Sequence, residues 1–100
     1  MNSYEIWFFN ERSDLMDISK GRKLLKKFNS VIEADNYIIF KLGNKIRDFL
    51  SAAYAREPEN IEVIRLCTNN LHHIYHIGAS YTKIETSEHL FECWARVYEE

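Results

Sequence analysis

The sequence predicts an α+β fold in which three helices pack on a small mixed or antiparallel sheet of about four strands. Runs rich in β-branched and aromatic residues alternate along the chain with runs that have apolar residues at helical spacing. Their order is roughly β-α-β-α-β-β-α, which places helices against a sheet. Hydrophobic residues make up 46% of the chain, against three glycines and one proline, so we expect residues 1–100 to form a single compact domain.

The first predicted element is a strand over residues 3–10, SYEIWFFN. Aromatic and β-branched residues dominate this run, which ends at Asn10, a residue type common in turns. Apolar side chains occur at both alternating sets of positions. Because a strand with one buried face is apolar only at every second position, this pattern predicts a central strand covered on both faces.

An amphipathic helix is predicted over about 17–34. At 100° per residue, its apolar residues fall within about 140° of arc and its basic residues occupy the opposite half. Gly21 near the start disfavours the first turn by roughly 1 kcal/mol relative to alanine. The apolar residues of the stripe are Ile18, Leu24, Leu25, Phe28, Val31 and Ile32.

The middle of the chain allows two interpretations. In the first, residues 37–42, YIIFKL, form a short strand, and a helix capped by Asn44 follows until Pro58 disfavours helical backbone. In the second, the helical spacing continues through this run without a break. Its apolar positions are then Ile38, Leu42 and Ile46.

A hairpin is predicted next, with a strand over 61–67 and a two-residue turn at Asn69 and Asn70, because asparagine tolerates the positive φ that such a turn requires. The alternative is a short helix that begins at Asn70 and ends at Gly78. In the hairpin register, one face is expected in the core and holds Ile64, Leu66, Leu71, His73 and Tyr75. The other is expected to be partly exposed and holds Cys67, His72, Ile74 and His76.

Two elements are predicted after the hairpin. Residues 80–86 alternate weakly and are expected to form an edge strand, which offers a site for pairing with a second copy. The protein is accordingly expected to be a monomer or a homodimer. Ser87 is a suitable cap for a final helix. The apolar face of that helix holds Leu90, Phe91, Trp94, Val97 and Tyr98.

Histidines at positions 72, 73 and 76 raise the question of a metal site. In the hairpin, His72 and His76 lie ~13 Å apart, too far for one ion, whereas in a helix they lie one turn apart. The sequence has no HExxH or CxxC motif that would complete a site. We therefore assign no metal, no cofactor and no catalytic residue, and we expect His73 to be hydrogen-bonded at the edge of the core. A small hydrolase or nuclease based on His72 and His76 remains an alternative.

Charge is divided unevenly along the chain. Residues 1–50 carry nine basic and seven acidic side chains, and residues 51–100 carry four and eight, so the two halves have net charges of +2 and −4. The basic run KGRKLLKK offers an anion-binding face for nucleic acid, although a net charge of −2 is not typical of a dedicated nucleic-acid binder. The residues of this face are Lys20, Lys23, Lys26 and Lys27.

The function predicted first is that of a small interaction protein that binds and blocks a partner protein, as immunity proteins, antitoxins and phage-encoded inhibitors do. The acidic second half favours a basic partner such as a toxin or a nuclease. The absence of a signal-peptide pattern and of an apolar run of ~20 residues predicts a cytoplasmic protein that does not contact a membrane. The predicted partner-binding residues are His72, Tyr75, His76, Glu88 and Glu92.

Overall fold

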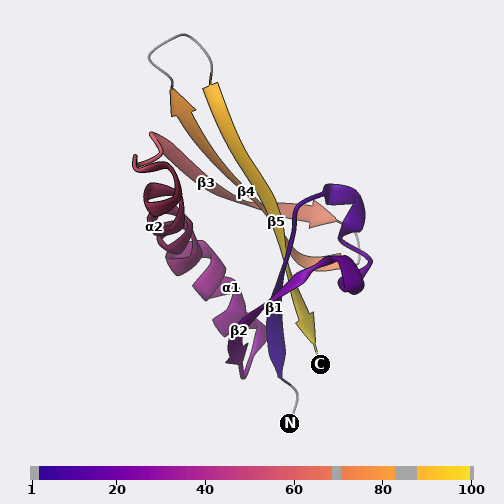
Figure 1. The fold of residues 1–100 in the computed structure, drawn as a ribbon. Coiled ribbons are helices and arrows are strands. Elements are labelled where there is room, and N and C mark those ends of the chain that lie inside the picture. The colour runs from indigo at the N-terminus through magenta and orange to yellow at the C-terminus, as the bar shows by residue number, and fades with distance from the viewer. Residues whose placement is uncertain (1–2, 69–70, 83–87, 100) are drawn as a thin grey trace.

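The computed structural model describes residues 3–68, 71–82 and 88–99 and shows one antiparallel sheet of five strands crossed by a single long helix (Figure 1). The α+β class agrees with the sequence, but the prediction of about four strands and three helices is wrong. The strand order across the sheet is β2-β1-β5-β4-β3. The strands are β1 (Tyr4–Phe9), β2 (Arg22–Phe28), β3 (Asn60–Thr68), β4 (Leu71–Thr82) and β5 (Glu88–Glu99).

The helix is continuous through three segments, α1 (Val31–Tyr37), a π-helical turn (Ile38–Leu42) and α2 (Gly43–Tyr54). Ser30 caps its start, because the Ser30 hydroxyl accepts a hydrogen bond from the Glu33 N–H at 3.1 Å. Ala55 ends the helix in the left-handed conformation, with φ at 54°.

The middle of the chain therefore follows the second interpretation of the sequence. The predicted strand over 37–42 is wrong, and so is the separate helix capped by Asn44, because Ile38 and Leu42 pack into the core from one unbroken helix. Tertiary burial of these apolar side chains outweighs the β propensity of the local run. The helix ends four residues before Pro58.

The predicted helix over 17–34 is also wrong. Residues 18–20 form one 3₁₀ turn, and 22–28 form β2 beside β1. The register explains the misleading pattern: four residue steps in β2, from Lys27 to Lys23, match two steps in β1, so β2 contains a bulge of two residues. The extra residues of the bulge allow two apolar residues and then two basic residues to follow one another in β2. In the sequence, this spacing resembles that of an amphipathic helix.

The predicted final helix is a strand. β5 pairs with β4 from Glu88 to Arg96 and with β1 from Trp94 to Glu99. Its side chains alternate between the two faces of the sheet, with Cys93, Ala95 and Val97 in the core beneath the helix. The apolar residues of the run EHLFECWARVYE fit both a helical period and a strand period. Backbone hydrogen bonds to neighbouring strands on two sides stabilise the strand.

The hairpin of β3 and β4 is confirmed over the short helix, although Asn69 and Asn70 lie outside the described residues. Thr68 pairs with Leu71 as expected, but a bulge then shifts the register by one, and Ile64 lies opposite His76 rather than Tyr75. His73 at the bulge has φ at 64°.

The bulge also changes which side chains the hairpin buries. Ile74 is buried although the sequence predicted partial exposure, and Ile64 is 47% exposed although it was predicted in the core. The predicted edge strand over 80–86 is wrong as well, because residues 80–82 continue β4, which lies inside the sheet, and 83–87 lie outside the described residues.

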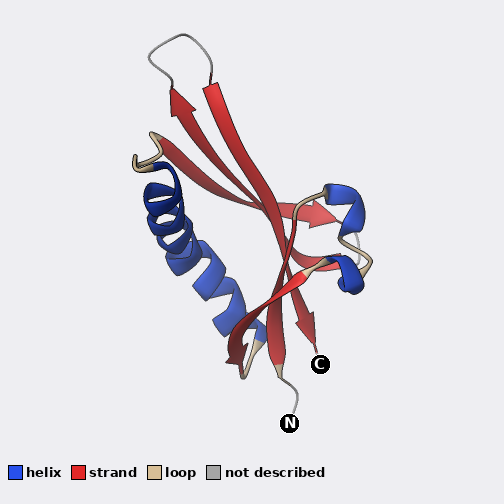
Figure 2. Ribbon diagram, in the orientation of Figure 1, coloured by secondary structure: helices blue, strands red, loops and turns tan. Residues whose placement is uncertain are grey.

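The core has two layers, one on each face of the sheet. Beneath the helix, Ile6, Tyr75 and Ile77 pack against helical side chains, and this confirms that β1 is an interior strand. On the other face, the segment 10–21 folds back and inserts Leu15 against Phe9 and Ile74 (Figure 2). This segment covers only part of that face.

The helix crosses the sheet diagonally. α1 contacts β1, β2 and β5, whereas α2 contacts β3 (Figure 1). The molecule is elongated, with extents of 51 × 24 × 23 Å. In the part of the chain that the structure describes, no helix has the length and apolar character needed to span a membrane.

Candidate interaction surface

Two of the predicted partner-binding residues, His76 and Glu92, lie together on the sheet face opposite the helix. His76 Nε2 is 3.0 Å from the Glu92 carboxylate, and the His76 ring lies 5.3 Å from the Trp94 ring. Glu92 is exposed and His76 is partly exposed. These residues form a small acidic and aromatic patch, and their role in partner binding stays a prediction.

The other three residues of that set do not join the patch. Tyr75 is fully buried beneath the helix, and its hydroxyl donates to the Asp35 carboxylate. We therefore withdraw Tyr75 from the partner-binding set. The side chains of His72 and Glu88 lie outside the part of the structure that is described.

The four lysines of the predicted anion-binding face are separated by the fold. Lys20 pairs with Asp14 at 3.7 Å, and Lys23 pairs with the buried carboxylate of Glu5 at 2.9 Å. Lys26 instead lies on the helix side, 4.9 Å from the centre of the Tyr37 ring. Lys27 lies opposite Glu5 in the β1–β2 register.

A groove of about 380 Å³ lies between β2 and the helix. Phe28 and Tyr37 form its floor, with their ring centres 5.3 Å apart. The Lys26 and Lys45 ammonium groups lie 4.9 and 5.7 Å from the Tyr37 ring centre, close enough for cation–π attraction. The full lining is Phe28, Glu33, Asn36, Tyr37, Phe40 and Lys41.

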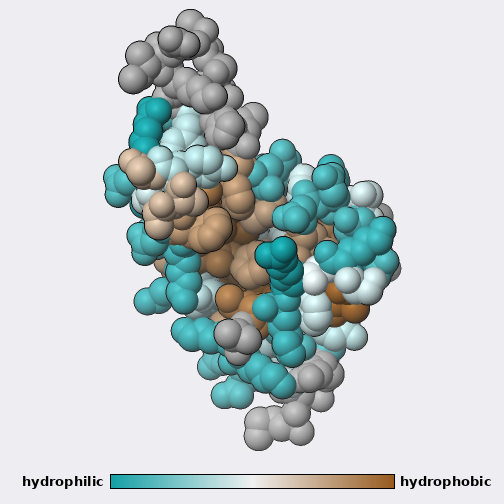
Figure 3. Space-filling model, viewed as in Figure 1, coloured by the Kyte–Doolittle hydropathy of each residue, from teal (hydrophilic) through white to brown (hydrophobic). Residues whose placement is uncertain are grey.

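The helix exposes several large apolar side chains, one of which lines this groove. Phe40, which lines it, is 69% exposed, and Phe49 in α2 is 65% exposed. Figure 3 shows hydrophobic side chains gathered between the helix and the strands, bordered by hydrophilic ones. The other exposed apolar residues of the helix are Ile32, Ile39 and Tyr54.

A polar network beneath the helix joins α1 to the hairpin. His73 Nδ1 lies 2.9 and 3.0 Å from the two Asp35 carboxylate oxygens, and Tyr75 donates to the same carboxylate. Arg65 lies at the rim, 4.0 Å from Asp35. The hydrogen-bonded role predicted for His73 is confirmed. Its left-handed backbone, rare for a residue other than glycine, is maintained by the bulge that presents the ring to Asp35.

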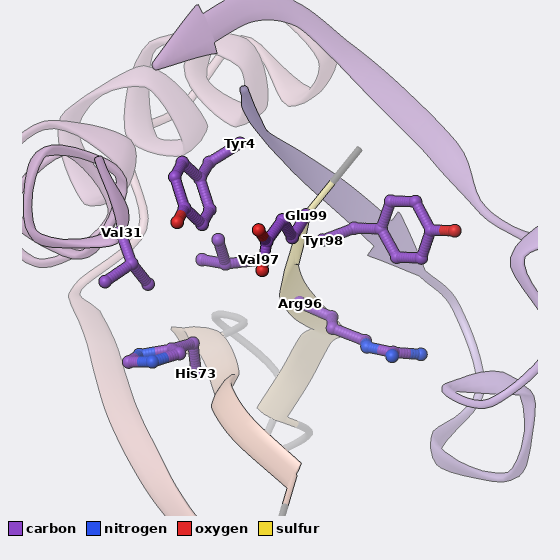
Figure 4. A pocket seen from close by; sticks show the side chains of 7 residues that line it. All are labelled: Tyr4, Val31, His73, Arg96, Val97, Tyr98 and Glu99. Atoms are coloured by element: carbon purple, nitrogen blue, oxygen red, sulfur yellow. The ribbon is translucent and has the colours of Figure 1, made fainter. Parts of the chain in front are cut away.

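A hollow of about 360 Å³ lies beside His73 (Figure 4). Tyr4, Val31, His73 and Val97 surround it, while the Arg96 and Tyr98 side chains extend away. Its size suits a small molecule. The lining residues include no serine, threonine, cysteine or lysine for His73 to activate as a nucleophile. Among the described residues, no three His, Cys, Asp or Glu side chains form a group that could hold a metal ion.

Burial raises the pKa of Tyr81 in the core, and it also perturbs two groups that adjoin Glu92 and Asp35. It raises the pKa of the Cys93 thiol to about 12, with a further contribution from the nearby Glu92 carboxylate. Burial and the hydrogen bond to Asp35 raise the pKa of Tyr75. Both groups therefore remain protonated near neutral pH, and neither is prepared to act as a nucleophile or a base.

Sequence reasoning missed both the groove and the network. Asp35 is 38 and 40 positions away from its partners on β4, a separation that no local motif records. The groove was missed because two predictions were wrong: it forms only when 22–28 is a strand and 37–42 is helical. The one available signal was the alternative helical spacing through Ile38 and Leu42.

Comparison with models of protein families, with curated proteins and with solved structures gives no match to this chain.

Proposed function

We propose that the protein binds a partner protein through the groove between β2 and the helix and through the exposed helical surface beside it. The observation that carries this proposal is the 69% exposure of Phe40 directly beside an aromatic groove. Exposed apolar side chains gathered in one region, with a polar rim, are typical of protein–protein binding sites. We call Phe28, Tyr37, Phe40 and Lys41 the groove residues.

The rim of the groove indicates the chemistry of the partner. Lys26, Lys41 and Lys45 surround the aromatic floor, and Glu33 is the one acidic residue that lines it. An apolar segment flanked by acidic side chains is complementary to this arrangement. At this site the partner is therefore acidic, in contrast to the basic toxin or nuclease that the sequence favoured.

Two observations support a protein partner over single-stranded nucleic acid here. Bases bind by stacking on exposed aromatic faces, and the Tyr37 ring between the two lysines is only 7% exposed, which leaves Phe40 as the largely exposed aromatic ring of the groove lining. Lys20 and Lys23 are engaged by Asp14 and Glu5, so the basic run does not form one continuous track for a phosphate backbone. For the alternative based on His72 and His76, the structure shows His76 paired with Glu92, and the His72 side chain lies outside the part of the structure that is described.

Selection from a random peptide-display library tests the proposal. We expect peptides enriched in Phe, Leu or Ile next to Asp or Glu, because these side chains match the floor and the rim. The Phe40→Ser and Lys41→Glu variants should each lower the affinity of a selected peptide at least tenfold. Ile64→Ser, which removes an exposed apolar side chain on the opposite face of the sheet, is the matched control.

Three results would contradict the proposal. The first is a selection without an acidic and apolar consensus. The second is an affinity that Phe40→Ser leaves unchanged or that Ile64→Ser lowers equally. The third is binding of a labelled single-stranded oligonucleotide that Lys41→Glu abolishes, which would assign the groove to nucleic acid.

A further inference from the structure

Among the described residues, no strand pairs with the outer edge of β5 over its first half. β1 pairs with β5 only from Trp94 to Glu99, because β1 ends at Phe9. Over residues 88–93, β5 is paired with β4 alone among the described residues. Six residues of strand span about 20 Å, a common length for a strand. The outward N–H and C=O groups of this edge form a template for one more strand in line with β1.

The face opposite the helix carries an acidic row that ends at this edge. Glu62, Gly78 and Glu92 lie side by side across β3, β4 and β5. Glu62 and Glu92 are exposed, and a hollow of about 180 Å³ lies at the central glycine, lined in part by Glu62 and His76. A strand added to β5 would place its own residue directly opposite Glu92, about 5 Å away.

We infer that this edge binds an extended segment of a partner protein that has arginine or lysine opposite Glu92 and apolar residues at the alternate positions. The basic side chain would pair with Glu92 and, if it is arginine, reach across it toward the hollow and Glu62. The alternate positions face the helix side, where Phe91 is only partly buried against the Leu50 cluster. Backbone pairing supplies affinity and the alternating side chains supply specificity.

The same charges argue against a second copy of this chain as the occupant. In antiparallel self-pairing about a two-fold axis at Leu90, Glu88 would lie opposite Glu92 of the other copy. Shifting the axis to Phe91 would place Leu90 opposite Glu92. Neither register supplies a cation to the acidic row, and the first brings like charges together.

The test uses a synthetic peptide of alternating valine and arginine, read by hydrogen exchange of the β5 backbone amides. We expect the outward amides within 88–93 to exchange at least tenfold more slowly with saturating peptide. The same peptide with N-methylated amides on its pairing edge should give no protection. Glu92→Lys should reverse the preference toward a valine–glutamate peptide, while Ile39→Ser, on the exposed helix surface, should change nothing.

The inference is overturned if the peptide leaves β5 exchange unchanged or if the N-methylated peptide protects equally. Protection that needs no peptide but grows with protein concentration would overturn it too, since a second copy would then occupy the edge. These outcomes are independent of the proposed function, because Phe40→Ser should leave β5 protection intact and Glu92→Lys should leave selection at the groove intact.

Discussion

The helix presents two apolar surfaces, and the comparison between them separates folding from binding. On its inner surface Ile38 and Leu50 are at most 1% exposed and pack against the sheet. On its outer surface the Phe40 and Phe49 side chains are 69% and 65% exposed, so the described residues leave most of each side chain open to solvent. Composition alone therefore does not distinguish a core residue from a residue that is available to a partner.

Truncating one residue on each surface tests most strongly whether the inner surface stabilises the fold and the outer surface does not. Ile38→Ala should lower the free energy of unfolding by about 3 kcal/mol, because it leaves a cavity in the core. Phe40→Ala should change it by no more than about 0.5 kcal/mol. Urea denaturation of both variants measures the effect. Equal losses would mean that Phe40 contributes to the fold and that the outer surface is not free for binding.

The Asp35 network should give the next largest effect. Asp35→Ala removes the acceptor of the Tyr75 hydroxyl and leaves that buried group unpaired, so we expect a loss of about 2 kcal/mol in the free energy of unfolding. Asp48→Ala, at an exposed position of the same helix, is the matched control. If both variants are equally stable, the network does not fasten the helix to the hairpin.

Alkaline pH should produce the smallest effect. Because the folded state raises the pKa of Cys93 from 9.0 to about 12, the unfolded thiol loses its proton first, and stability falls as pH rises above 9. We expect about 1 kcal/mol to be lost by pH 10, with a smaller contribution in the same direction from Tyr75.

Urea denaturation under reducing conditions between pH 7 and pH 10 measures this dependence. Cys93→Ala is less stable at every pH because it leaves a small cavity, but its stability should fall less steeply with pH. A slope identical to that of the unmodified chain would show that Cys93 is not the group responsible.

Local sequence patterns predicted the elements whose environment is simple. β1 has apolar residues on both faces and lies inside the sheet, and β3 and β4 form the hairpin that asparagine at 69 and 70 suggested. In β1 and β3 propensity and alternation favour the same structure, and at the hairpin the turn chemistry favours the strand over the short helix that the sequence also allowed.

The secondary-structure predictions were wrong where the spacing of apolar residues fits both a helix and a strand. Residues 22–28 and 88–99 carry apolar spacing that suits a helix as well as a strand, and only pairing with distant strands decides between the two. The groove and the Asp35 network depend on those long-range contacts, so the candidate site was not accessible to local reasoning. Of the residues proposed for binding from the sequence, the structure brings His76 and Glu92 together and buries Tyr75.

We propose that the outer surface of the helix and the adjoining groove contact a partner protein. A photocrosslinking amino acid at position 40, in cells that produce the chain, tests this most directly. We expect one discrete crosslinked product that is absent with the probe at position 64, the exposed apolar site on the opposite face, and that Lys41→Glu removes. Crosslinking of equal yield at both positions, or none at position 40, would contradict the account.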